Sequence, residues 1–157
     1  MELGRSESVI AILKILFLKR MESSIEAFKI SLKRLIDFQH CFLKILAKGS
    51  ALDRESYRKF FIEYEVDEFQ DETTEFIQEN LPAINADDYE IEKIKDAVNN
   101  DIEMLTNIYN KIERFEAKDD AKLRTLMDTL RKLKNNKVVI FGYFKDTMRY
   151  LYRNLRE

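Results

Sequence analysis

Few side chains in this sequence have the type and spacing that bond-making chemistry needs. The one histidine, His40, and the one cysteine, Cys41, are neighbours in a helical pattern. Consecutive helical positions point about 100° apart, which does not suit a Cys–His nucleophilic pair. Two ligands are also too few for a zinc site. We predict a buried structural cysteine beside a histidine at the polar face or its boundary.

Acidic residues cluster in the middle of the chain, where Glu63, Glu65, Asp67 and Glu68 could be imagined as metal ligands. The Asp-x-Asp-x-Asp-Gly pattern of a calcium loop is missing. We therefore predict no metal site, and we interpret the stretch from about 63 to 86 as a solvated acidic connector.

Nucleotide hydrolysis needs a glycine-rich phosphate loop with a lysine, carboxylates for magnesium and arginines for the transition state. The three glycines, Gly4, Gly49 and Gly142, are scattered along the chain, and no G-x-x-x-x-G-K-[ST] occurs. We predict no catalytic residue, no cofactor-binding residue and no ATP hydrolysis by this chain alone.

The elements that would position any site are helices. The 157 residues leave room for one core, and with three glycines and one proline the chain has few helix breakers. Formal net charge is -2, but cations outnumber anions by 8 to 3 from Lys14 to Lys48 and by 13 to 7 from Lys111 onward, while anions lead by 14 to 3 from Asp53 to Glu92. The apolar run from Val9 to Leu18 is too short to cross a bilayer. We expect a soluble, cytoplasmic chain with no membrane association.

Apolar residues at three- and four-residue steps predict several helices. The first begins at Ser6 or Ser8 and ends near Arg20, and a second starts at a capping box of Ser23 and Glu26 and stops at Gly49. The others cover about 53–69, a long stretch from a cap at Asp87 or Asp88 to Phe115, and a helix capped by Asp119 or Asp120 that ends at Asn135-Asn136. The fold class is mainly α: long antiparallel helices forming a helical bundle.

The carboxyl end changes in kind. Val138 to Phe141 is a short β-branched and aromatic run, closed by Gly142 and followed by a helix with Met148, Leu151, Tyr152 and Leu155. This pattern predicts a strand buried on both faces in a parallel sheet. No other strand is predicted in this chain, so we expect this strand–helix unit to belong to a larger α/β domain.

Two blocks resemble Swi/Snf-like superfamily 2 DNA helicases, particularly a prokaryotic helicase-related branch. Leu16 to Phe28 reads LFLKRMESSIEAF and is similar to the helical block between the two motor lobes. From Asp120 to Leu155, Lys122-Leu123 precedes KVVIFGYFKDT at Lys137 to Thr147, similar to the start of the C-terminal lobe. Gly142 and Tyr143 depart from the serine and glutamine that are usual there.

The resemblance implies a division of the chain and a role for it. Residues 1–118 would be the helical inter-lobe region, and 119–157 the start of the helicase C-terminal RecA-like lobe. The parent would be an ATP-dependent DNA translocase using ATP and Mg, and this chain a non-catalytic fragment that braces and couples its lobes. Residues near the nucleic-acid backbone would be Lys145, Thr147, Gly142 and Tyr143, although Asp146 or Thr147 could instead simply cap the last helix.

A second hypothesis needs no motor. The nearly all-apolar stretch from Val9 to Leu18 must be covered, and a second copy of the chain could cover it. The chain would then be a self-contained helical protein-interaction or dimerisation module. Its partners would be either the missing helicase lobes, with DNA bound through the parent, or another copy of itself.

Overall fold

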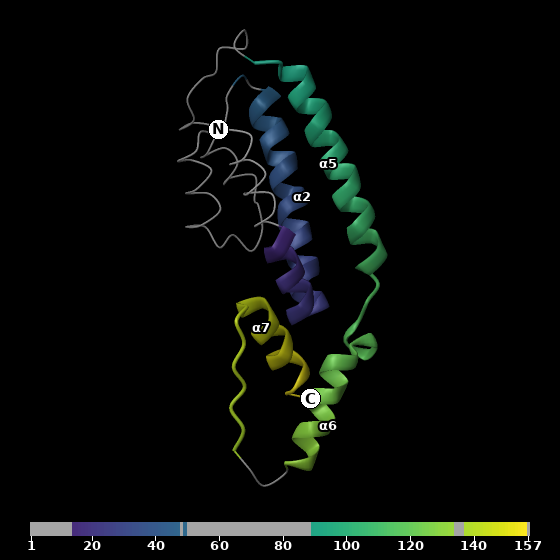
Figure 1. The fold of residues 1–157 in the computed structure, drawn as a ribbon, viewed down its shortest axis with the longest axis vertical. Helices are drawn as coiled ribbons and strands as arrows, with labels where there is room; N and C mark the ends of the chain where they lie inside the picture. The colour runs from purple at the N-terminus through teal and green to yellow at the C-terminus, as the bar shows by residue number, and fades with distance from the viewer. Residues whose placement is uncertain (1–13, 48, 50–88, 134–136, 157) are drawn as a thin grey trace. The chain divides into compact units, whose positions relative to one another are not determined.

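The computed structural model describes residues 14–47, 49, 89–133 and 137–156. These residues are mainly helical, which confirms the predicted fold class at that level. Residues 14–23 are helical and are followed by α2 (Ile25–Ala47), α5 (Ile91–Ile112), the short 3-10 helix η3 (Ala117–Asp119), α6 (Ala121–Lys132) and α7 (Lys145–Asn154), as drawn in Figure 1. The helix predicted over 53–69, the acidic connector and the caps at Asp87 or Asp88 lie outside the described residues.

The described residues fall into two compact units. The first contains 14–31 and the described residues from 110 to 156, and the second contains those between 32 and 109. Helices α2 and α5 each contribute to both units. Both blocks that resemble the helicase family therefore have most of their residues in the first unit, although they stand far apart in the sequence.

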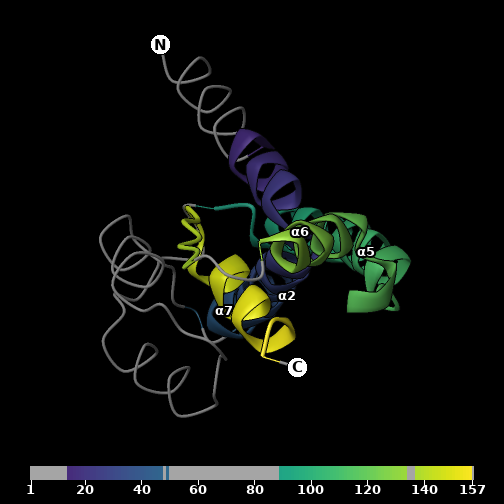
Figure 2. The same ribbon diagram turned by 90° about the horizontal axis from the view of Figure 1, so that it is seen from below.

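The break between the first helix and α2 lies at Ser24. The Ser24 side chain accepts a hydrogen bond of 3.0 Å from the backbone N–H of Ala27, which is the geometry of an N-cap. The predicted cap at Ser23 was therefore wrong by one residue. An N-cap side chain accepts a hydrogen bond from the backbone N–H three residues later, and a serine at either position could accept one. The hydroxyl of Ser23 is bonded to Thr147. Figure 2 shows the helix over 14–23 leaving the axis of α2 at this point.

The second unit has an apolar core built from α2 and α5. Its buried residues are Leu32, Phe38, Cys41, Ile45 and Leu46 from α2 and Val98 from α5. His40 is exposed beside the buried Cys41, as predicted. Gly49 has φ of +78°, which confirms the left-handed stop after α2. In Figure 1 the chain directions of α2 and α5 are opposed.

The first unit is organised around the caps of its short helices. Asp120 caps α6 by accepting a bond of 3.0 Å from the N–H of Leu123, which selects one of the two predicted caps. Helix α6 ends at Lys132; Asn135 and Asn136 are outside the described residues. Helix α7 follows the apolar run as predicted, and Phe144 occupies its N-cap position without a side-chain bond. The suggestion that Asp146 or Thr147 caps this helix was wrong, since both lie inside its first turn.

Residues 137–144, between α6 and α7, have no regular secondary structure. The described part of the chain contains no strand, so the predicted strand has no partner there with which to pair. No helix among the described residues is long and apolar enough to cross a membrane.

Candidate functional site

Two parts of the first unit meet at the N-terminal end of α7. The guanidinium of Arg20, on the helix over 14–23, donates to the Asp146 carboxylate at 2.9 Å, between residues 126 positions apart. The same guanidinium lies over the Phe144 ring, 5.0 Å from its centroid. Arg20 thus holds both an anion and an aromatic face, which the planar guanidinium suits better than lysine would.

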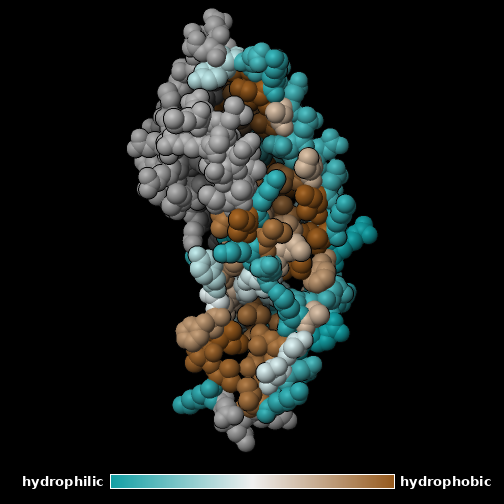
Figure 3. Space-filling view, in the orientation of Figure 1, coloured by the Kyte–Doolittle hydropathy of each residue, from teal (hydrophilic) through white to brown (hydrophobic). Residues whose placement is uncertain are grey.

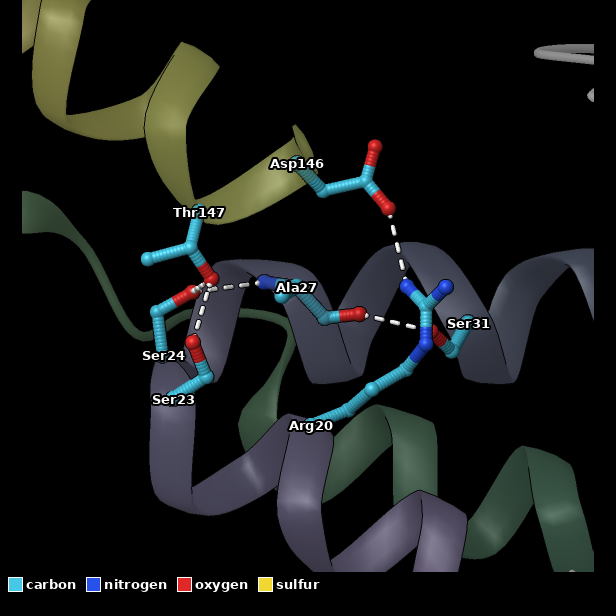
Figure 4. Close-up of polar contacts among 7 residues, drawn as sticks. All are labelled: Arg20, Ser23, Ser24, Ala27, Ser31, Asp146 and Thr147. Atoms are coloured by element: carbon cyan, nitrogen blue, oxygen red, sulfur yellow. Dashed lines mark hydrogen bonds and ion pairs between the residues drawn. The ribbon is translucent and has the colours of Figure 1, made fainter. Parts of the chain in front are cut away.

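Three hydroxyls meet beside this ion pair (Figure 4). The Thr147 hydroxyl lies 2.8 Å from the Ser23 hydroxyl and 3.1 Å from that of Ser24. Ser24 also accepts a hydrogen bond from the Ala27 N–H. The three hydroxyls therefore join the N-cap of α2 to the first turn of α7. We call the contacts of Arg20, Ser23 and Ser24 with Phe144, Asp146 and Thr147 the interlock.

Burial explains why these polar groups must be paired. Ser24, Asp146 and Thr147 are 5%, 6% and 7% exposed. A buried polar group without a partner costs free energy, so each contact restrains the two segments relative to one another. Asp146 also places a negative charge in the first turn of α7, where the helix dipole favours it.

A second set of polar contacts joins α6 to α7. The Tyr150 hydroxyl donates to Asp120 at 3.0 Å, and the other carboxylate oxygen of Asp120 caps α6. Burial raises the pKa of Tyr150, and the hydrogen bond and negative charge of Asp120 raise it further. Lys122 on α6 donates to the backbone carbonyl of Glu22, next to the interlock. Asp120 and Lys122 thereby tie α6 into the same arrangement.

A pocket of about 230 Å³ opens beside this connection. It is lined by Ile25, Glu26, Lys29, Phe115, Glu116, Ala117, Asp120 and Tyr150. The Lys29 ammonium donates to the Phe115 carbonyl at 3.1 Å and lies 3.5 Å from the Glu26 carboxylate. Lys29, Asp120 and Tyr150 form hydrogen bonds with other groups of the protein. These lining residues therefore have a structural role and are not arranged around a reacting group.

The interlock holds groups in place and does not activate them. The hydroxyls of Ser23 and Ser24 both bond to the hydroxyl of Thr147, and none of the hydrogen bonds described for these three residues involves an imidazole. A serine nucleophile needs an adjacent base within hydrogen-bond reach. Within the described ranges no three His, Cys, Asp or Glu side chains are grouped so that they could hold a metal ion.

The four residues predicted to face nucleic acid lie on one turn but in different environments. Lys145 is exposed at the start of α7, and Tyr143 is 92% exposed with its ring 5.0 Å from that of Phe144. Thr147 is buried in the interlock. Gly142 is exposed, and a Cβ there would overlap the sulfur of Met148, so the serine usual in the family would require this flexible side chain to move. Tyr143 and Lys145 are both exposed, whereas Thr147 is buried.

Sequence reasoning missed the residues that make the interlock and its second connection. Arg20, Ser24, Asp146 and Tyr150 were not predicted as site residues. The available signal was a pair of cations, Lys19 and Arg20, directly after a long apolar run, and two adjacent polar residues at the start of an amphipathic helix. Neither feature identifies a partner more than a hundred residues away.

Two apolar surfaces of this unit remain exposed. On the helix over 14–23, Ile15, Leu16, Leu18 and Met21 are 53%, 46%, 58% and 47% exposed. Between α6 and α7, Val139, Phe141 and Tyr143 are 73%, 91% and 92% exposed. Figure 3 shows apolar residues gathered over the segment between α6 and α7. Exposed apolar groups on this scale are typical of surfaces that another element covers.

Comparisons of the chain with protein-family models, with curated proteins and with solved structures gave no match.

Proposed function

We propose that this chain is a non-catalytic piece of a Swi/Snf-like ATP-dependent DNA translocase, in which it braces and couples the two motor lobes. The observation that carries the proposal is the interlock, because it joins the two blocks on which the resemblance rests. Arg20, Ser23 and Ser24 come from the block similar to the inter-lobe helices. Asp146 and Thr147 come from the block similar to the start of the second lobe.

Coupling follows from the mechanics of these contacts. An ion pair, a hydroxyl cluster and the Lys122–Glu22 bond restrain α7 and α6 against the helix over 14–23. A displacement of the second lobe would therefore move this helix as well. In the proposed parent, ATP and Mg are bound by the lobes, and this chain transmits the movement without touching the nucleotide.

The finer architecture belongs to this proposal too. We expect the helices to form an antiparallel bundle, and residues 138–141 to become a strand of the parent's second RecA-like lobe, from residue 119 onward. The run of Val138, Val139, Ile140 and Phe141 is typical of a strand covered on both faces. The parent would act on DNA in the cytoplasm.

Contact with DNA in the parent would come from the turn before α7. Lys145 and Tyr143 are exposed and can reach a phosphate, and the exposed backbone at Gly142 can approach closely. Thr147 supports this turn from inside through Ser23 and Ser24.

Reconstitution tests the proposal. The chain is joined to the polypeptides encoded on either side of it, and ATP hydrolysis is measured with and without duplex DNA. DNA-stimulated hydrolysis is expected, with the stimulation reduced by Arg20→Ala and unchanged by Lys19→Ala, an exposed cation on the same helix. Adjoining sequences that lack a phosphate-binding loop and arginine-bearing motif, or the absence of DNA stimulation, would refute it.

The exposed face of the helix over 14–23 favours a second candidate function, a dimerisation module. Ile15, Leu16, Leu18 and Met21 would be covered by a second copy. Light scattering of the purified chain should then give twice the monomer mass, and Leu18→Glu should restore the monomer while Lys19→Glu does not. A folded wild-type monomer at high concentration would exclude this function.

A further inference from the structure

The helix over 14–23 is held against the first unit by one of its sides. Phe17, Arg20 and Ser23 recur at three-residue steps and are half-buried. Each of them contacts another part of the first unit, through a ring pair, an ion pair and a hydrogen bond. Because residues three apart lie on the same side of a helix, these three define its inner face.

The opposite side of the helix is centred on Leu18, which is 58% exposed. Ile15 and Met21 stand three residues before and after Leu18, and Lys14 and Glu22 stand four residues before and after it. All five residues are exposed. Residues three and four apart on a helix are neighbours, so these five form one surface, which we call the outer face.

The chemistry of the outer face is symmetric about Leu18. On either side of Leu18 the third residue is apolar and the fourth is charged, with a cation before it and an anion after it. A two-fold axis brings the same surface of two copies together, so such a surface must be complementary to itself. The outer face meets this condition, because its apolar residues can meet each other and its cation can meet its anion.

An antiparallel pair of these helices, with Leu18 on the two-fold axis, matches these groups. Residues equally far before and after Leu18 then lie at the same height along the pair. Ile15 is level with Met21 of the other copy, and Lys14 is level with Glu22 of the other copy. A parallel pair would instead set Lys14 beside Lys14 and Glu22 beside Glu22, and such like-charge contacts are unfavourable.

The charges of the outer face are free to form these pairs. Within the described ranges, neither the Lys14 nor the Glu22 side chain forms an ion pair. The bond from Lys122 is made to the backbone carbonyl of Glu22 and leaves its carboxylate exposed. The carboxylate also disfavours an anionic lipid surface as the cover of this face, because it would face the headgroups beside Leu18.

We infer that the outer faces of two copies pair as antiparallel helices about Leu18, with Lys14 of each copy forming an ion pair with Glu22 of the other. This inference rests on the second candidate function, dimerisation, and adds the orientation and register of the interface. The inner face is not used, so each copy keeps its own interlock. Because both copies use the same surface, the dimer is closed.

Exchange of the two charges tests the register on the full chain. Lys14→Glu sets like charges level with each other at both ends of the pair, as does Glu22→Lys, so each should raise the dimer dissociation constant about tenfold. The double variant restores opposite charges and should return to within about threefold of wild type. Lys19→Glu, at an exposed position outside the outer face, is the control. Analytical ultracentrifugation measures the constants, and circular dichroism checks that each variant folds.

A crosslink tests the same register by distance. Chains carrying Lys14→Cys are mixed with chains carrying Glu22→Cys and treated with a short bifunctional maleimide. The antiparallel pair brings the two cysteines level, so the mixture should give a crosslinked dimer. Neither variant alone should give one, because in that pair the two copies of one position lie eight residues, about 12 Å, apart along the helices. The native Cys41 is buried, and the wild-type chain controls for it.

A dimer whose dissociation constant ignores both charge exchanges, or a crosslink from either variant alone, overturns the antiparallel register and leaves dimerisation standing. A folded wild-type monomer at high concentration overturns dimerisation and this inference with it. So does a monomer that binds phosphatidylglycerol vesicles and loses that binding in Leu18→Glu, since a lipid surface would then cover the outer face. The motor proposal is decided separately, by DNA-stimulated hydrolysis in the reconstituted protein.

Discussion

Arg20 and Asp146 form an ion pair of 2.9 Å between the first described helix and the first turn of α7. Because Asp146 is 6% exposed, its charge depends on partners inside the protein. The pair therefore fixes the relative position of two helices that the sequence separates by most of its length. The same guanidinium lies over the ring of Phe144, the residue directly before α7.

Removing Arg20 should destabilise the protein more than its partial exposure suggests. Arg20→Ala leaves Asp146 buried without this ion pair and should lower the free energy of unfolding by about 1–3 kcal/mol. Denaturant titration measures the loss, and Arg20→Lys should recover only part of it because lysine lacks the planar guanidinium. A double-mutant cycle with Asp146→Asn should give a coupling energy of about 1 kcal/mol or more. Additive effects would mean that the two side chains do not interact.

The hydroxyl cluster should be sensitive to a change that preserves shape. Thr147→Val removes one hydroxyl and leaves those of Ser23 and Ser24 without their shared partner, so unfolding free energy should fall by about 1–2 kcal/mol. The matched control is Thr129→Val on α6, where the hydroxyl is exposed and bonds the Thr125 carbonyl. That control should change stability by less than about 0.5 kcal/mol. Equal effects of the two substitutions would show that the cluster makes no special contribution.

Local pattern was sufficient for most helices of the described chain and insufficient for the site. The helix predicted to end at Phe115 and the cap at Asp120 rest on short-range features. The structure confirms the cap and most of the helix, which ends at Ile112, three residues before the predicted end. Ser23 and Ser24 are adjacent and both bond Thr147, so the sequence pattern did not indicate that Ser24 rather than Ser23 accepts the Ala27 N–H. The ion pair between Arg20 and Asp146 is likewise a tertiary contact, which the spacing of apolar residues along the sequence cannot predict.

The burial of Tyr150 could not be predicted from the sequence pattern either. The predicted apolar face of the last helix included Tyr152, which is 59% exposed, and omitted Tyr150, which is buried. The two tyrosines are equivalent by composition. What distinguishes them is the carboxylate of Asp120, within bonding distance of only one of them among the described contacts.

Alkaline pH should weaken the protein through Tyr150. Its pKa is raised above the ordinary value of 10.0 by burial and by Asp120. A raised pKa means that the unfolded chain loses the phenolic proton first, so the contribution of Tyr150 is complete below about pH 10 and is lost as pH rises further. Tyr150→Phe should reduce this alkaline loss of stability, and Tyr152→Phe should not. An identical pH dependence in wild type and Tyr150→Phe would contradict the burial of the phenol.

The core of the second unit should respond as a packed interior. Ile45 is fully buried, so Ile45→Ala should lower the free energy of unfolding by about 2–4 kcal/mol. Met104→Ala, at a position 63% exposed, is the control and should change it by less than about 0.5 kcal/mol. Thermal or denaturant unfolding followed by circular dichroism measures both. A small effect at Ile45 would place this residue outside the core.

The contact between the two distant segments is central to the proposed coupling, and a crosslink tests this contact most directly. The hydroxyls of Ser23 and Thr147 lie 2.8 Å apart, close enough for cysteines at these positions to form a disulfide after small adjustments. In the variant Ser23→Cys with Thr147→Cys, mild oxidation should produce an intramolecular crosslink, seen as faster migration on a non-reducing gel and reversed by reductant. Single-cysteine variants control for the native Cys41. Crosslinking no greater than in Ser23→Cys with Thr129→Cys would contradict the interlock and the coupling proposed from it.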